Sequence, residues 1–173
     1  MTVLVAYGSN GGSTAEIAEW IGGELRDAGL AAEVRPAGEV RDVTRYEAFV
    51  LGGAIYATGW HVDARRFGHR FAAALAGRPV WIFSSGPLDR SADETELPPV
   101  PQVKVAMRAL GARGSVTFGG RLSDSGRGWL GFISRRMARR GFGGDFRNRE
   151  RIAAWARRIA SEIKPATAVD TSR

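Results

Sequence analysis

Residues 8–14 form a run of small and polar residues with the composition of an anion-binding loop. The run reads Gly-Ser-Asn-Gly-Gly-Ser-Thr and lies between an apolar segment and a helical pattern. Its glycines let a ligand approach the backbone, and its hydroxyl and amide groups surround the free N–H groups of a helix N terminus, which attract anions. The sequence therefore predicts a phosphate site made by Ser9, Asn10, Gly11, Gly12, Ser13 and Thr14.

Two nucleotide-binding motifs are absent from this loop. The first basic residue of the chain is Arg26, so the loop lacks the lysine with which a P-loop reaches the β and γ phosphates. The pattern G-x-G-x-x-G of dinucleotide sites is absent as well. A phosphate monoester thus fits better than a triphosphate or a dinucleotide. The alternative is an ordinary strand-to-helix turn with a cap, but seven consecutive small or polar residues exceed what a cap needs.

Two further loops carry groups that suit a flat heterocycle. Residues 52–61 place aromatic side chains between glycines, and a ring could stack there. Residues 84–89 supply hydroxyl and N–H donors for the carbonyl and imide edge of such a ring. Each loop alone is ordinary, since aromatics after a strand are usually core residues and S-S-G-P is a common turn. The candidate contacts are Ala54, Ile55, Tyr56, Trp60, Ser84, Ser85, Gly86 and Pro87.

The elements that must position these loops alternate between strands and helices. Apolar or β-branched runs predict strands over 3–6, 31–35, 49–51, 80–84 and 115–118, and helical spacing predicts helices over 14–29, 62–75, 103–110 and 149–163. This alternation is typical of a three-layer α/β sandwich with parallel strands, whose ligands bind outside the carboxyl ends of the strands. We expect one domain over 1–164 and a disordered tail over 165–173.

Composition excludes several kinds of chemistry. The chain has 173 residues and no cysteine, which removes disulfides, thiolate metal sites and thiol nucleophiles, so redox chemistry must come from a cofactor. The two histidines, His61 and His69, do not predict a metal site. No G-x-S-x-G elbow is present, which argues against a hydrolase triad. No signal sequence and no long apolar segment is seen, so we expect a cytoplasmic protein.

The charge is divided unevenly along the chain. Residues 1–100 carry a net charge of −4 and residues 101–173 a net charge of +11, which favours an anionic partner for the C-terminal part. Within it, residues 127–142 predict a basic amphipathic helix with Arg127 and Trp129 near its start and arginines at i, i+4 spacing, namely Arg135, Arg136, Arg139 and Arg140. Its apolar stripe could simply pack on the sheet; its arginines could bind an anionic membrane leaflet or the carboxylates of a porphyrin. Nucleic acid is a weaker candidate, because no binding module is recognisable.

The order and content of the three loops resemble the flavodoxin family. The first loop is similar to the family's T/S-x-T-G-x-T phosphate motif at Ser9, Gly12 and Thr14, and it departs from the motif at Gly11, where a hydroxyl residue is usual. The segments V-L-G-G-A-I-Y, F-G-G-R-L, G-D-F-R and R-I-A-A-W-A-R-R-I-A resemble the quinone-dependent, flavodoxin-like protoporphyrinogen oxidases more than the acidic electron carriers.

This resemblance implies a flavodoxin-like fold, a five-stranded parallel sheet in the order 2-1-3-4-5, and FMN as cofactor. It places the FMN phosphate on residues 9–14, Tyr56 or Trp60 against the isoalloxazine, and Ser84, Ser85 and Gly86 at the polar edge of the ring. The flavin would carry electrons or hydride from a reduced substrate to a quinone, with no catalytic side chain and with a possible peripheral position at the inner membrane face. The alternative is a cofactor-free α/β module whose basic face docks on a membrane or an acidic protein.

Overall fold

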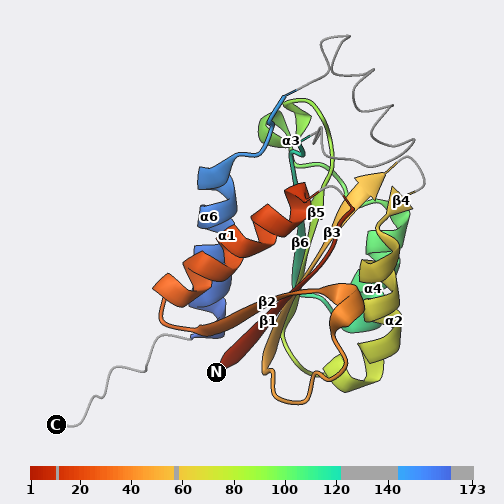
Figure 1. Cartoon of the computed structure of the whole chain (residues 1–173), viewed down its shortest axis with the longest axis vertical. Helices are drawn as coiled ribbons and strands as arrows, with labels where there is room; N and C mark the ends of the chain where they lie inside the picture. Colours follow the sequence, from red (N-terminus) through yellow and green to blue (C-terminus); the bar gives the residue numbers. More distant parts are fainter. Residues whose placement is uncertain (11, 57–58, 122–143, 165–173) are drawn as a thin grey trace, which may run out of the picture.

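A parallel β-sheet with helices on both faces makes up the core of this chain (Figure 1). The computed structural model describes residues 1–10, 12–56, 59–121 and 144–164. The strands lie in the order β2-β1-β3-β5-β6, which confirms the predicted five-stranded order. They are β1 (Thr2–Gly8), β2 (Ala31–Pro36), β3 (Ala48–Tyr56), β5 (Val80–Ser85) and β6 (Gly114–Phe118).

Each face of the sheet is covered by a pair of helices. Side chains from alternate positions of a strand enter opposite layers, so Val3 and Val5 pack with one pair and Leu4 and Ala6 with the other. The first pair is α1 (Ser13–Asp27) and α6 (Arg149–Ile163), and the second is α2 (Val62–Leu75) and α4 (Pro101–Leu110). Because both faces are covered, the inner strands β1, β3 and β5 are mostly apolar and buried, whereas the edge strands β2 and β6 are more polar.

The predicted helix boundaries agree with the structure to within two residues. Helix α1 ends in a Schellman motif, in which Gly29 at φ +80° donates its N–H to the carbonyl of Arg26 and Leu30 donates to Leu25. Three short elements were not predicted from the sequence: the turn η1 (Ala37–Glu39), the helix α3 (Ser91–Glu94) and the strand β4 (Gly59–Trp60), which pairs antiparallel with β3. These elements carry too few residues to show a periodicity.

Strand β3 is longer than its predicted 49–51 because two glycines stay inside the sheet. The sequence indicated a turn at Gly52 and Gly53, yet both pair with β1 and with β5. A Cβ on Gly52 would overlap the ring of Phe83, and a Cβ on Gly53 would lie 2.5 Å from Nε1 of Trp60. These glycines therefore make room for rings packed flat against the strand.

Two predicted features lie outside the described residues: the basic amphipathic helix over 127–142 and the C-terminal tail over 165–173. Within the described ranges, none of the helices combines the length and the hydropathy that crossing a membrane requires.

We predict that Gly52→Ala lowers the free energy of unfolding by about 1–3 kcal/mol, because the added methyl group forces Phe83 out of a filled core. Gly23→Ala is the matched control: Gly23 lies in α1, no atom lies within 4 Å of the position that a Cβ would take there, and alanine favours helix by up to about 1 kcal/mol. Urea unfolding of both variants measures the difference. Equal midpoints for the two variants would contradict the packing argument.

Candidate functional site

The three predicted loops meet at one edge of the sheet. The register pairs Gly8 of β1 with Gly53 of β3, and Ala54 of β3 with Ser85 of β5. Because these strands are parallel, the loops that follow them leave the sheet at the same end (Figure 1). The same end receives the turn after β6, since Ser85 pairs with Phe118. This convergence is what a ligand site of an open α/β sheet requires.

The loop after β1 leads into a helix with an open N terminus. Gly12 is the N-cap residue of α1 with φ +80°, and no atom lies within 4 Å of the position its Cβ would take. Among the residues that the structure describes, no side chain caps α1, whereas His61 accepts a hydrogen bond at the start of α2 and Asn148 at the start of α6. Among the described residues, the first-turn N–H groups of α1 thus have no side chain as cap, and such groups are the ones that bind anions at a helix N terminus.

Hydroxyl groups around this loop already accept hydrogen bonds from the backbone. The Oγ of Ser9 accepts from the N–H of Gly12 at 3.2 Å, and the hydroxyl of Tyr56 accepts from the N–H of Asn10 at 3.1 Å. The Oγ of Ser13 accepts from the N–H of Arg121 at 3.2 Å. A hydroxyl that accepts in this way keeps its own proton to donate. Ser13 and Thr14 are buried, Ser9 and Asn10 lie nearer the surface, and Gly11 is outside the described residues.

Two arginines distant in sequence lie at the first turn of α1. Glu16 in that turn pairs with Arg121 at 2.8 Å and with Arg147, whose side chain is only 3% exposed. Arg147 also pairs with Asp145 at 2.6 Å and lies over the ring of Trp20. Hydrogen bonding to Arg147 lowers the pKa of both Glu16 and Asp145 from their ordinary values. The negative charge of Glu16, in the first turn of α1, is thus balanced by the positive charges of the two arginines.

These arginines were not predicted as part of the site. The sequence suggested a phosphate cradle without any cation, because no basic residue precedes Arg26. The fold brings Arg121 there from the turn after β6, and its Nε atom is buried without a hydrogen-bond partner among the described residues. The sequence signal was the F-G-G-R-L segment, which contributed only to the family resemblance.

Tyr56 is the exposed aromatic side chain of the second loop, and Trp60 is not. Tyr56 ends β3 and is 37% exposed, next to the loop that begins at Ser9. Trp60 is 2% exposed, packs on Gly53 and donates its indole N–H to the carbonyl of Gly53 at 3.1 Å. Pairing of β4 with β3 directs the ring of Trp60 into the core, so of the two ring contacts expected from the sequence, Tyr56 is the one with an exposed side chain. Ala54 is buried and Ile55 is partly buried.

The third loop offers fewer free donors than the sequence suggested. Ser84 and Ser85 are buried in the sheet at 2% and 4% exposure. The N–H of Gly86 donates to the carbonyl of Phe118 at 3.0 Å, and the carbonyl of Pro87 accepts from Gly120 at 2.9 Å. The backbone of this loop is thus used to join β5 to the turn after β6. Gly86 also packs against Ile55, because a Cβ added to Gly86 would lie 3.0 Å from the Cβ of Ile55.

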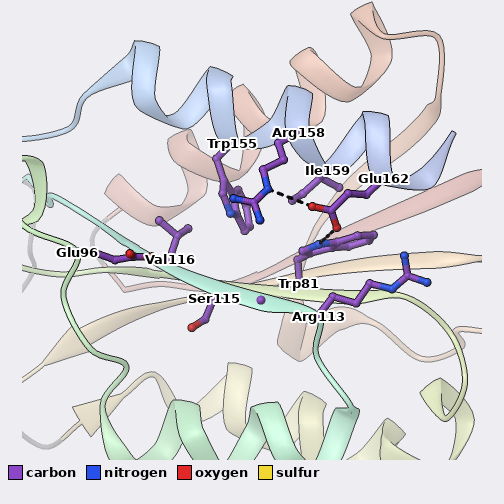
Figure 2. Close-up of a pocket in the computed structure, with 10 residues that line it drawn as sticks. Trp81, Glu96, Arg113, Ser115, Val116, Trp155, Arg158, Ile159 and Glu162 are labelled. Atoms are coloured by element: carbon purple, nitrogen blue, oxygen red, sulfur yellow. Dashed lines mark hydrogen bonds and ion pairs between the residues drawn. The ribbon is translucent and has the colours of Figure 1, made fainter. Parts of the chain in front are cut away.

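A separate pocket of about 210 Å³ lies between α6 and the strands β5 and β6 (Figure 2). Trp81 and Trp155 line it, and Glu162 accepts hydrogen bonds from the indole of Trp81 at 3.2 Å and from Arg158 at 3.1 Å. Trp81 stands near the start of β5, away from the end where the three loops meet. In the described ranges, no group of three His, Asp or Glu residues could hold a metal ion.

Comparison with known proteins identifies the family of this fold. A family model for the flavodoxin domain matches residues 4–139. No curated protein sequence matches the chain.

Several solved structures share the fold at low sequence identity. A cysteine-to-serine mutant of the flavodoxin from Pseudomonas aeruginosa is 18% identical with a TM-score of 0.60, over 95% of this chain and 99% of that chain. A flavodoxin from the domain Archaea is 17% identical with a TM-score of 0.55, over 81% of this chain and 98% of that one. Rubredoxin oxygen:oxidoreductase from Desulfovibrio gigas is 12% identical with a TM-score of 0.63, over 94% of this chain and 36% of that one.

We predict that Arg147→Met lowers the free energy of unfolding by about 1–2 kcal/mol at neutral pH, less than for a fully buried pair because Glu16 is 45% exposed. Because the pKa values of Glu16 and Asp145 are lowered in the folded protein, this stabilisation is fully present above the pKa of about 4 that such groups have in the unfolded chain. It is lost as the pH falls through the lowered folded values, so the deficit of the variant shrinks in acid.

Denaturant unfolding between neutral and acidic pH measures this effect. Arg66→Met is the control, because Arg66 is 77% exposed in a pair with Asp63 at 4.0 Å and should contribute little. A deficit for Arg147→Met that is independent of pH would show that the ion pairs do not cause it.

Proposed function

The chain belongs to the flavodoxin domain family, and from this premise we propose that it is an FMN-dependent oxidoreductase. In this proposal the protein passes electrons or hydride between a reduced substrate and a quinone-like acceptor. Its folded core is that of redox flavoproteins, and FMN is the cofactor that the family implies. The observation that carries the proposal is the uncapped N terminus of α1 at the point where three loops converge.

The groups around the first loop suit a phosphate monoester. The Cα of Gly12 faces open space, the first turn of α1 lacks a side-chain cap, and Arg121 has a buried Nε without a partner among the described residues. Backbone N–H groups at a helix N terminus bind phosphate through hydrogen bonds and the helix dipole. We therefore assign the FMN phosphate to Ser9, Asn10, Gly11, Gly12, Ser13 and Thr14.

Tyr56 is the residue that we assign to the face of the isoalloxazine ring. Its ring is exposed beside the phosphate loop, and its hydroxyl fixes Asn10. When bound, FMN supplies the electron or hydride chemistry, and the protein orients it and adjusts its potential through stacking and hydrogen bonds. The backbone of the loop after β5 lies along the same edge, so Ala54, Ile55, Ser84, Ser85, Gly86 and Pro87 remain our proposed contacts for the rest of the ring.

We further propose that the protein belongs to the branch of quinone-dependent, flavodoxin-like protoporphyrinogen oxidases. Two of the segments that resemble protoporphyrinogen oxidases contain Arg121 and Arg147, and both arginines pair with Glu16 at the start of α1. Two of the four resembling segments therefore reach the start of α1, next to the phosphate loop. In this branch the substrate would lose an electron pair and two protons per turnover, and the quinone would take them up to become a quinol.

Contacts with the substrate or a membrane stay predictions. The residues concerned, Arg127, Trp129, Arg135, Arg136, Arg139 and Arg140, lie outside the described residues. Support for an anionic partner is the net charge of +11 over 101–173. The cofactor-free module is not carried forward, because membership of this family implies FMN.

We predict that purified protein is yellow with bound FMN and that Gly12→Glu weakens FMN binding at least tenfold, because a carboxylate above the first turn of α1 repels the phosphate. Gly77→Glu is the matched control: it has φ +79° and equally open surroundings, but it follows α2 at the other end of the sheet. A second pair of variants tests the hydroxyl of Thr14: Thr14→Val should also weaken FMN binding, and Thr2→Val at the start of β1 should not. FMN fluorescence titration gives the affinities of all four variants. Equal affinities for the two glutamate variants would remove the phosphate assignment.

We predict that the flavin-loaded protein oxidises protoporphyrinogen under anaerobic conditions only when a menaquinone analogue is present. Porphyrin fluorescence and quinol formation should rise together, and both should be absent with Gly12→Glu. Protein that binds FMN but turns over neither substrate would contradict the oxidase proposal and leave a simple electron carrier.

A further inference from the structure

His61 joins the phosphate loop to helix α2. Its Nε2 atom lies 3.1 Å from Oδ1 of Asn10, and its Nδ1 atom accepts the N–H of Asp63 at 3.1 Å as the N-cap of α2. The ring is 4% exposed. One buried imidazole thus holds a residue of the loop after β1 and begins the helix that follows β4.

The two contacts require one protonation state of this ring. Because Nδ1 accepts a backbone N–H, it carries no proton, and the proton of the neutral ring is therefore on Nε2, where it is donated to Asn10. The ring has little room to turn away from this arrangement. A Cβ on Gly8 would lie 2.6 Å from Nδ1, so the imidazole packs directly against the backbone of β1.

Asn10 is held from two sides as a result. Its side chain accepts from His61, and its backbone N–H donates to the hydroxyl of Tyr56. The centroids of the Tyr56 and His61 rings are 6.0 Å apart. The geometry of the loop that we assign to the phosphate therefore depends on the neutral imidazole and on Tyr56 together.

We propose that His61 is a positioning residue of the FMN site, whose neutral ring holds Asn10 in place and whose protonation loosens the phosphate loop. This inference rests on the proposed function. It adds a residue that makes no contact with the cofactor in our assignment, together with a dependence of FMN affinity on pH.

The groups around the ring give the direction of that dependence. The carboxylate of Asp63 on α2 lies 3.9 Å from Nδ1. Tyr56 on β3 is the titratable side chain that faces the ring, and Gly8 on β1 packs against it. Asn10 carries no charge. Burial lowers the pKa of His61 below its ordinary value, against a smaller opposing effect of Asp63. A proton on Nδ1 would leave the N–H of Asp63 without its acceptor and would favour the carboxylate of Asp63 instead. Nε2 keeps its own proton and the ring is packed against Gly8, so protonation would act on Asn10 by shifting the start of α2 together with the ring.

The same shift determines where stability is lost. The neutral ring is favoured in the folded state, so its contribution is complete above the unfolded pKa of about 6.5 and declines as the pH falls toward the lowered folded value. FMN affinity should decline at lower pH, as the pH falls through the lowered pKa of the folded protein, because the ring stays neutral above it.

The test separates the two contacts of His61. In His61→Asn the shorter side chain keeps an oxygen acceptor for the N-cap of α2 but cannot reach Asn10. We expect the FMN dissociation constant at neutral pH to rise about threefold to tenfold, as for the loss of one hydrogen bond. The melting temperature of the FMN-free protein should fall as well, because a buried ring is shortened, so affinities are compared at a temperature at which every variant is folded. His69→Asn, at the other histidine of the chain and exposed on α2, should bind FMN as the unsubstituted protein does.

The pH profile supplies a readout that a merely structural role would not move. Titration of the FMN phosphate affects every variant equally. The extra loss of affinity as the pH falls through the lowered pKa of the folded His61 should therefore appear in the unsubstituted protein and in His69→Asn, and be absent in His61→Asn. Asn10→Ala should weaken binding at least as much as His61→Asn, because Asn10 is itself assigned to the phosphate, and the double variant should be no weaker than Asn10→Ala.

The outcomes are distinguishable. If the unsubstituted protein does not bind FMN, the proposed function fails and this inference with it. If that protein binds FMN but His61→Asn matches His69→Asn in affinity and pH profile, the role of His61 is overturned and the proposed function stands. Additive effects of Asn10→Ala and His61→Asn would also overturn it, because the residues would then act separately.

Discussion

An open helix N terminus at the end of β1 is the feature on which the remaining arrangement of the site depends. Within the described part of the chain, the N–H groups in the first turn of α1 have no side-chain cap, and Gly12 at the N-cap adopts a left-handed conformation. An anion at such a position is stabilised by aligned peptide dipoles without needing a charged side chain of its own. The surrounding residues serve this turn: hydroxyl groups of Ser9, Ser13 and Tyr56 lie around it.

The electrostatic balance at this turn is set by residues far along the chain. A lone Glu16 would repel a phosphate at the start of α1, although acidic residues in a first turn stabilise a helix. Arg121 and Arg147 pair with Glu16, and Asp145 completes a compact group of charges. The helix thus keeps its favourable acidic residue while the net charge near the loop stays low. This group also joins the segments on either side of residues 122–143 to α1.

Close approach of rings to the backbone is a second constraint. The imidazole of His61 lies against Gly8, the ring of Phe83 against Gly52 and the indole of Trp60 against Gly53. All three glycines lie in the carboxyl-terminal parts of β1 and β3, where the site is formed. Without a Cβ at these positions, ring side chains can lie on the strands and fix the loops that leave them. The glycine content of the chain is therefore tied to packing as well as to turns.

The sequence by itself determined the longer elements, the parallel pairing of the strands and the loop that begins at Ser9, because periodicity, length and composition are local properties that need no knowledge of the partner. The order of the strands came from the resemblance to the flavodoxin family. It also indicated the family. Only the tertiary structure decided that Trp60 is core while Tyr56 is exposed, that Arg121 and Arg147 stand beside Glu16, and that His61 holds Asn10. Those outcomes depend on strand register and on contacts between residues far apart in the chain, 131 positions in the case of Glu16 and Arg147. Residue type and spacing do not encode such contacts, since many pairings of side chains are compatible with one local pattern and the packed core selects among them.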